Sequence, residues 1–300
     1  MSVVRYFWSC PCKGTHTFGD TKGVSKFNLS RKKRSNVSVK SGNGSSLEIA
    51  VNTIKTAETL VPYSSDAVNL GVLIWDLIDD IPSAERHKLL DLLAETDIMR
   101  LWRLAGERNK APTSSLATSK VPDYSIWEDM PKEGSRDLPR FRGRALLPMG
   151  LGSFEKELFS SFPKSKGTAE TQNCAPIYGH VLHSGYATMI KNVIYPGPLY
   201  FKAIVEPSLV PMLSDTCDMV FTYSLEETSM EEIGSIAAIH GWRAPKACNP
   251  PPFDSNYTDY IRVVGPGVFI GLGYGDNNKN NTLLSSLMPM PLFFAMVRME

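Results

Sequence analysis

Two histidines three residues apart, His180 and His183, are the first side chains in the sequence that could bind a metal ion or transfer a proton. Residues three apart on a β-strand point to opposite faces, so this spacing suits a shared metal ion poorly. Val181 and the neighbouring glycines favour a strand here. Cys174 lies nearby in the sequence, but it is not one of a closely spaced cysteine pair as in many zinc sites. The sequence therefore predicts no metal and no cofactor.

Glycine-rich stretches could bind a phosphate or present a nucleophile, but both examples fail on their surroundings. Gly150-Leu151-Gly152-Ser153 resembles only a glycine-rich turn, without the arrangement of a serine nucleophile elbow. Gly271, Gly273 and Gly275 fall late in a predicted strand that no helix follows, unlike a dinucleotide-binding loop. Neither stretch predicts catalysis.

Acidic residues give an equally weak indication of catalysis. Asp215 and Asp218 lie three apart at the start of a predicted strand, where turn and solvent-facing positions are expected. A pocket could still be assembled from distant residues such as His183, Glu206 and Tyr223. The sequence favours a non-catalytic protein and leaves a barrel isomerase or cyclase as an alternative.

Basic residues are unevenly distributed along the chain. Residues 1–46 hold nine basic residues and one acidic residue, a net charge of +8, whereas the remainder holds 23 basic and 30 acidic residues, a net charge of −7. The acidic remainder argues against nucleic-acid binding. Arg140, Arg142 and Arg144 alternate along one strand face, which is either solvated or in contact with an anionic lipid head group or acidic partner.

The basic segment 1–46 is rich in serine and lacks a long apolar core, as in an organelle transit peptide. We predict a disordered transit peptide for the chloroplast, to the stroma or the thylakoid, because its arginines are not spread along an amphipathic helix. The alternatives are a disordered basic tail, or a nuclear or nucleic-acid signal at Arg31 to Arg34. The sequence contains no run of ~18 apolar residues that could form a transmembrane segment. Cys10 and Cys12 would leave with the presequence, and the remaining Cys174, Cys217 and Cys248 are an odd number at wide spacing, which does not suggest a disulfide framework.

The element most clearly able to position a site is the stretch from Tyr260 to Tyr274. Two β-branched and aromatic runs flank Gly265-Pro266-Gly267, which predicts a hairpin. In the second run, apolar residues on one face alternate with Phe269, Gly271 and Gly273 on the other. Alternate glycines indicate tight coiling or the close approach of another group. If this glycine face points inward, it leaves room for a ligand.

Eight segments have the pattern of strands separated by turns, which indicates an antiparallel barrel and not a βαβ sheet. The predicted strands are Phe141–Leu147, Ile177–Ile190, Leu199–Val205, Asp218–Leu225, Ile236–His240, Tyr260–Val264, Val268–Tyr274 and Leu292–Arg298. Several of them have one apolar face. The predicted ligand-binding residues come from these faces and from the glycine face, and they are Phe201, Phe221, Tyr223, Gly271 and Gly273.

The chain divides into four segments by composition. The transit peptide 1–46 is followed by helical periodicity over residues 47–106, by a polar, proline-containing linker over 107–136 and by the barrel over 137–300. The predicted fold class is α+β, with an N-terminal helical segment before an antiparallel β-barrel.

A family resemblance is carried by the ends of the predicted barrel. Leu138 to Leu147 form an opening strand with an internal glycine, and Asp259 to Tyr274 with Leu292 to Arg298 form the closing strands. With the presequence, this arrangement over about half of the chain resembles plastid lipid-associated proteins, the fibrillins, and other lipocalin-like plastid proteins. The loop Gly275–Leu287 and the hairpin turn depart from that family, so no functional residue is transferred. The resemblance implies a lipocalin-like barrel that binds an apolar lipid or pigment-like molecule.

Three functions are compatible with these patterns. The leading hypothesis is a non-catalytic plastid protein whose barrel binds a hydrophobic small molecule, or the lipid of thylakoid or plastoglobule membranes. The alternatives are a plastid assembly or scaffold factor that binds a protein partner through its helical segment, and a barrel isomerase or cyclase. A large cavity favours the first, a filled barrel with an exposed helix groove the second, and a buried histidine or carboxylate in a pocket the third.

Overall fold

A computed structural model provides the fold of the chain. The residues that it describes are 44–57, 69–109, 139–147, 150–160, 176–184, 198–205, 207–211, 213, 215–246, 249, 253, 257–275 and 291–300. Most of the predicted transit peptide 1–46 and most of the predicted linker 107–136 lie outside these residues.

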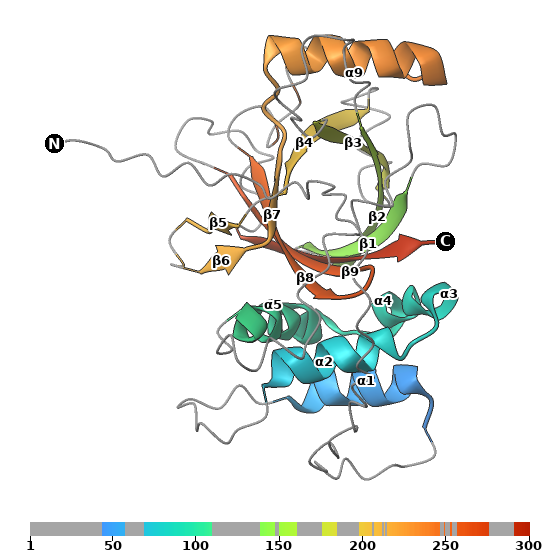
Figure 1. Ribbon diagram of the computed structural model, residues 1–300, viewed down its shortest axis with the longest axis vertical. Coiled ribbons are helices and arrows are strands. Elements are labelled where there is room, and N and C mark those ends of the chain that lie inside the picture. Colours follow the sequence, from blue (N-terminus) through green and yellow to red (C-terminus); the bar gives the residue numbers. More distant parts are fainter. Residues whose placement is uncertain are drawn as a thin grey trace, which may run out of the picture. The chain divides into compact units, whose positions relative to one another are not determined.

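Eight antiparallel strands close into a β-barrel, which confirms the predicted barrel (Figure 1). The strands are β1 (Arg140–Leu147), β2 (Gly150–Ser160), β3 (Ile177–Ser184), β4 (Leu199–Ile204), β7 (Met219–Thr222), β8 (Thr258–Gly265), β9 (Val268–Tyr274) and β10 (Leu292–Met299). Their order around the barrel follows the chain, and β1 pairs with both β2 and β10 to close the ring. Between β4 and β7, the chain forms a separate two-stranded sheet of β5 (Ser208–Leu209) and β6 (Thr216–Cys217).

The strand prediction is wrong in two places. It assigns no strand to residues 150–160, where β2 runs, because the glycines at its start favour a turn. It assigns a strand to Ile236–His240, which instead forms the end of helix α9 (Glu227–His240). Gly241 ends that helix in the left-handed conformation, with a φ of 69°. A short apolar run does not by itself distinguish a strand from part of a helix.

The predicted hairpin is present as β8 and β9, which are joined at Pro266 and Gly267. Gly267 has a φ of 70°, a conformation that glycine adopts without strain. Between Val263 and Gly265 the register shifts, and the absence of a Cβ on Gly265 leaves room for Ile78 of the helical segment. The hairpin is therefore both part of the barrel wall and a contact surface for the helices.

Helices precede the barrel, within and just beyond the predicted helical segment. They are α1 (Ser46–Thr56), α2 (Leu70–Asp79), α3 (Ser83–Arg86), α4 (Leu89–Leu92) and α5 (Glu95–Asn109). Ser45 and Glu48 form a capping box at the start of α1, and Asn69 caps α2. None of the described helices combines the length and the apolar character needed to cross a membrane.

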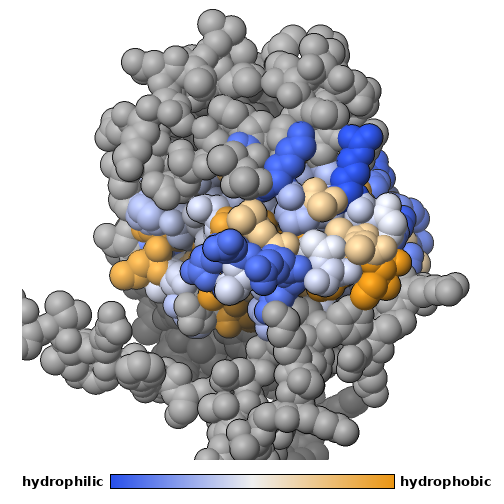
Figure 2. All heavy atoms as spheres, turned by 90° about the horizontal axis from the view of Figure 1, so that it is seen from above, coloured by the Kyte–Doolittle hydropathy of each residue, from blue (hydrophilic) through white to orange (hydrophobic). Residues whose placement is uncertain are grey.

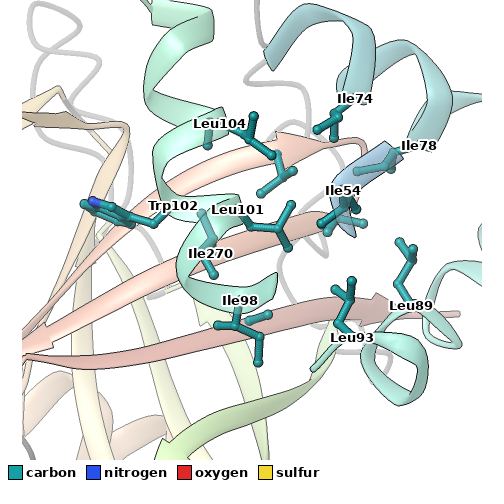
Figure 3. Packing of buried hydrophobic residues seen from close by; sticks show 14 of the residues in the cluster. Ile54, Ile74, Ile78, Leu89, Leu93, Ile98, Leu101, Trp102, Leu104 and Ile270 are labelled. Carbon is teal, nitrogen blue, oxygen red and sulfur yellow. The ribbon is translucent and has the colours of Figure 1, made fainter. Parts of the chain in front are cut away.

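The helices and the outer face of β8, β9 and β10 share one hydrophobic cluster (Figure 3). α5 lies across β8 and β9, and Figure 3 shows its Leu101 beside Ile270 of β9. Both of these side chains are buried. The hydrophobic effect, through burial of these apolar side chains away from water, is the main contribution that holds the helices on the barrel.

Helix α9 covers a different part of the barrel wall, formed by β2, β3 and β4. Tyr178 Oη donates to Glu232 Oε2 at 2.8 Å, and Tyr200 Oη donates to the carbonyl of Arg243 at 2.7 Å. Figure 2 views the molecule from the side on which α9 lies and shows hydrophilic and hydrophobic side chains interspersed among the coloured residues.

Candidate ligand-binding site inside the barrel

The five residues predicted to bind a ligand come together inside the barrel. Phe201 lies on β4, Phe221 on β7 and Tyr223 directly after β7, and all three are buried. The rings of Phe201 and Phe221 stack, with 4.6 Å between their centroids. Gly271 and Gly273 of β9 face the same interior.

Aromatic rings occupy the space that the interior glycines leave. A Cβ added to Gly271 would overlap the ring of Phe294. The other pairs of this kind are Gly143 with Phe154, Gly179 with Phe201, and Gly273 with the hydroxyl of Tyr257. The glycine face points inward, but its room is taken by rings, as in an eight-stranded barrel filled by its own side chains.

A buried ion pair crosses the interior between β2 and β8. Lys156 Nζ donates to Asp259 Oδ2 at 2.7 Å, and both side chains are buried. Tyr223 Oη donates to the same carboxylate oxygen at 2.7 Å. The register of β2 against β3 shifts between Glu155 and Lys156, as at a β-bulge. Asp259 is thus paired with an opposite charge and accepts hydrogen bonds, and a buried carboxylate requires both.

Five aromatic rings surround the ammonium of Lys156. The distances from Nζ to the ring centroids are 4.7 Å for Phe294, 5.1 Å for Phe221, 5.3 Å for Phe154 and Phe201, and 5.7 Å for Tyr223. All are within the ~6 Å at which a cation is attracted to the electron-rich face of a ring. The site therefore combines apolar, polarisable walls with one compensated pair of charges.

The two tyrosines beside Asp259 stay neutral at physiological pH. Burial raises the pKa of Tyr223 well above its ordinary value of 10.0, and the negative charge of Asp259 raises it further. Burial and then Asp259 raise the pKa of Tyr257 in the same way. Both phenols act as hydrogen-bond donors to the carboxylate and not as bases. The cluster is suited to orienting a polar group inside an apolar space.

His180, one of the histidines considered for metal binding or proton transfer, does not join this site. His180 lies on the outer wall, where its Nε2 is 2.9 Å from Glu157 Oε2 and its ring contacts Trp242. The side chain of His183 and the whole of Cys174 and Glu206 lie outside the described residues. Within the part of the chain that the structure describes, no group of three or more His, Cys, Asp or Glu side chains could hold a metal ion.

Asp215 and Asp218 belong to a second ionic cluster, between α5 and β8. Asp218 Oδ2 accepts hydrogen bonds from Arg108 Nη2 at 3.1 Å and from the backbone N–H of Val263 at 2.8 Å. Asp218 is buried, so the prediction that it faces solvent is wrong. The prediction failed because the partners of Asp218 come from elements distant in the sequence. Asp215 Oδ2 lies 3.2 Å from Arg262 Nη2. This cluster holds α5 on the barrel and is separate from the interior site.

The arginines on β1 share one face, as predicted, and they make contacts within the chain. Arg144 Nη1 donates to the carbonyl of Leu90 at 2.7 Å, and Arg142 Nη2 lies 3.5 Å from Asp91 Oδ1. Arg140 Nε pairs with a carboxylate of β2 at 2.9 Å. Two of these arginines bind α4, so the stripe has a structural role in fastening that helix.

Sequence reasoning missed the ion pair at the centre of the site. Lys156 lies between two glutamates, a pattern typical of a solvated strand face. It also lies between Phe154 and Leu158 at a period of two, which is the signal that it shares an apolar face. Asp259 gives a similar signal, since it alternates with Ile261.

Comparison with known proteins gives no identification. The chain matches no family model, no curated protein and no solved structure. The resemblance to plastid lipid-associated proteins therefore stays a prediction, and the residues of the site carry the functional argument.

Proposed function

We propose that the barrel binds one small hydrophobic molecule, lipid-like or pigment-like, whose polar end lies beside Lys156 and Asp259. The observation that carries this proposal is the meeting of five aromatic rings and one ion pair at a single point of the interior. Small-molecule sites are typically lined by apolar and aromatic side chains, with a few polar groups that fix the orientation of the ligand.

Stability of the fold alone does not account for the ion pair. Two buried charges lose their hydration, and replacing such a pair by apolar side chains is often neutral or stabilising. The hydrophobic side chains buried inside the barrel, here called the interior cluster, include Phe141, Leu158, Met219 and Met296. Since apolar and aromatic side chains fill the rest of this space, it could be filled without charges. Buried ionisable groups with perturbed surroundings are concentrated at functional sites. The pair therefore supports a role in recognition.

Lys156 and Asp259 also indicate the kind of polar end that the ligand carries. An ammonium has three N–H donors, and Asp259 takes one of them. A carbonyl or hydroxyl oxygen can accept another, whereas the carboxylate of a fatty acid finds no net positive charge here, because Asp259 already compensates Lys156. We therefore propose a neutral ligand with an apolar, preferably conjugated body and an oxygen acceptor.

Binding requires aromatic rings to move away from the glycines. With Phe294 packed against Gly271 and Phe154 packed against Gly143, side chains fill this part of the interior. Rotation of either ring would leave space beside a residue that has no side chain of its own, without a change in the barrel backbone. An eight-stranded barrel is large enough for one small ligand when its side chains leave room.

A scaffold role is the second candidate, and the filled interior favours it. In that role the barrel is only a rigid body, and a protein partner binds to the helical segment. The helices already use their apolar faces against the barrel, although Leu92 and Met99 remain exposed. The isomerase or cyclase alternative is less favoured, because Asp259 is already bonded to Lys156 and Tyr223.

Titration of the full-length protein with N-phenyl-1-naphthylamine, a neutral dye that fluoresces in apolar sites, tests the ligand proposal. We expect the wild type to bind one dye molecule. Gly271→Val should weaken binding by about tenfold or more, because valine fills the space that the ligand needs. Gly234→Ala is the control, since Gly234 lies on α9 and a Cβ there would meet only Pro245, at an ordinary contact distance of 3.9 Å. A wild type that binds no dye, or a folded Gly271→Val variant that binds it equally well, would favour the scaffold role.

We also propose that the protein acts in the chloroplast, a proposal that depends on the composition of residues 1–46. Fusion of this segment to a fluorescent reporter should direct the reporter to plastids. Diffuse cytosolic fluorescence or nuclear fluorescence would contradict the proposal.

A further inference from the structure

A cavity of about 280 Å³ lies on the outer wall of the barrel, where β4, β7 and β8 meet the start of α9. Its polar lining consists of Lys202, Thr222, Ser224, Glu226, Ser229, Tyr257 and Thr258. Three of these residues form a row across neighbouring strands, since Lys202 pairs with Thr222 and Thr222 pairs with Thr258. The volume is close to the lower end of the ~300–1,000 Å³ typical of small-molecule sites.

Tyr257 connects this cavity to the interior of the barrel. It contributes to the lining of the cavity, while its hydroxyl lies against Gly273 and bonds to Asp259. The rings of Phe253 and Tyr223 pack against it, with centroid distances of 4.6 Å and 5.5 Å. One side chain therefore takes part both in a polar cavity outside the barrel and in the ion-pair site inside it.

The groups that line the cavity match a neutral ligand group with several hydroxyls. Lys202 can only donate hydrogen bonds, an ionised Glu226 can only accept them, and the hydroxyls of Thr222, Ser224 and Thr258 can do both. The opposite charges of Lys202 and Glu226 compensate each other, so the cavity favours neither an anionic nor a cationic group. A sugar-like hydroxyl can accept from an ammonium and donate to a carboxylate at the same time.

We propose that this cavity binds the neutral, hydroxyl-rich head group of an amphiphile, whose apolar part enters the barrel past Tyr257. The part of the proposal that concerns the apolar chain rests on the function proposed above. The head-group site rests on the cavity alone, so the two can fail separately.

Calorimetric titration of the full-length protein with n-octyl β-D-glucoside, below its micelle concentration, tests the head-group site. The wild type should bind it, and Lys202→Met combined with Glu226→Gln should weaken binding by about tenfold or more, as expected for the loss of hydrogen bonds to charged groups. The same double variant should bind N-phenyl-1-naphthylamine, which has no such head group, as the wild type does. Lys55→Met with Glu231→Gln makes the same charge changes at exposed helix positions and is the control.

Each outcome of this titration decides the proposal. A wild type that does not bind the glucoside, or a double variant that binds it equally well, overturns the head-group site and leaves dye binding as evidence for the barrel. Glucoside binding that requires Lys202 and Glu226, in a protein that binds no dye, supports the cavity and refutes the barrel proposal together with passage of the chain into it.

The passage past Tyr257 has its own measurement. In stopped-flow experiments, Tyr257→Leu should speed dye association several-fold, because the smaller side chain no longer closes this end of the interior. Tyr260→Leu, on the outer face of β8, is the control and should leave the rate unchanged. Equal association rates for wild type and Tyr257→Leu would overturn the proposed route.

Discussion

Replacement of Lys156 by methionine should strongly destabilise the protein. The substitution removes one charge of the interior pair and keeps a long apolar side chain. Asp259 then remains buried, with a side-chain exposure of 3%, and without its opposite charge. Loss of one partner of a buried pair typically costs ~3–5 kcal/mol. This is a large part of the ~5–15 kcal/mol that stabilises a typical folded protein.

A second substitution separates the lost charge pair from lost packing. Lys156→Met combined with Asp259→Asn leaves an uncharged oxygen that can accept from Tyr223. The double variant should therefore be more stable than Lys156→Met alone by ~1–3 kcal/mol. Lys88→Met is the control, because the ion pair of Lys88 with Glu85 is about half exposed and contributes at most ~0.5 kcal/mol.

Urea unfolding of the full-length protein, followed by far-ultraviolet circular dichroism, gives the free energy of unfolding of each variant. A value for Lys156→Met within ~0.5 kcal/mol of the wild type would refute the burial of Lys156 against Asp259. A double variant that is no more stable than Lys156→Met would show that the cost came from packing and not from the unpaired carboxylate.

Three further predictions concern the barrel and its outer wall. Gly271→Val should lower the free energy of unfolding by ~1–3 kcal/mol because of overpacking, and a raised melting temperature would contradict the packing of this face. Burial raises the pKa of Glu157, but hydrogen bonds from His180 and Arg140 outweigh it and hold the pKa below 4.5, so its stabilising effect is present above pH 4.5 and is lost as the pH falls further. The urea midpoint of Glu157→Gln should therefore depend less on pH in this acid range, and a midpoint curve parallel to that of the wild type would refute the effect. Burial raises the pKa of Tyr200 from 10.0 to about 12, so its contribution is complete below pH 10.0 and is lost as the pH rises towards 12. The difference in phenolate absorbance between the wild type and Tyr200→Phe should develop only near pH 12. A difference that already develops near pH 10.0 would contradict the burial of Tyr200.

Much of the barrel could be predicted from the sequence because its signals are local. The strand Val268–Tyr274 has the same bounds in the structure as in the prediction. Its β-branched residues, its alternating pattern and the glycine turn before it all act within a few residues. The segment Ile236–His240 failed because a short apolar run fits both a strand and the buried side of a helix, and its packing on a distant barrel wall decided the outcome.

The sequence predicted several residues of the candidate site but not the ion pair at its centre or the rings that fill the space beside its glycines. A period of two was enough to assign Phe201, Phe221 and Tyr223 to the faces that the structure places inside the barrel. The pairing of Lys156 with Asp259 joins residues 103 positions apart, and no local pattern specifies such a partner. The rings beside the glycines are likewise not specified by the strand that bears the glycine, since Phe154, Phe201 and Phe294 lie on neighbouring strands and Tyr257 lies directly before β8.

Methionine methyl groups provide the most direct measurement of whether the barrel interior binds a ligand. Met219 and Met296 belong to the interior cluster and are buried, whereas Met99 lies on α5 and is 36% exposed. In the full-length protein labelled with carbon-13 at the methionine methyl groups, addition of N-phenyl-1-naphthylamine should shift the signals of Met219 and Met296 and leave that of Met99 unchanged. Interior signals that stay in place at saturating dye, or a shift of Met99 alone, would contradict ligand binding inside the barrel.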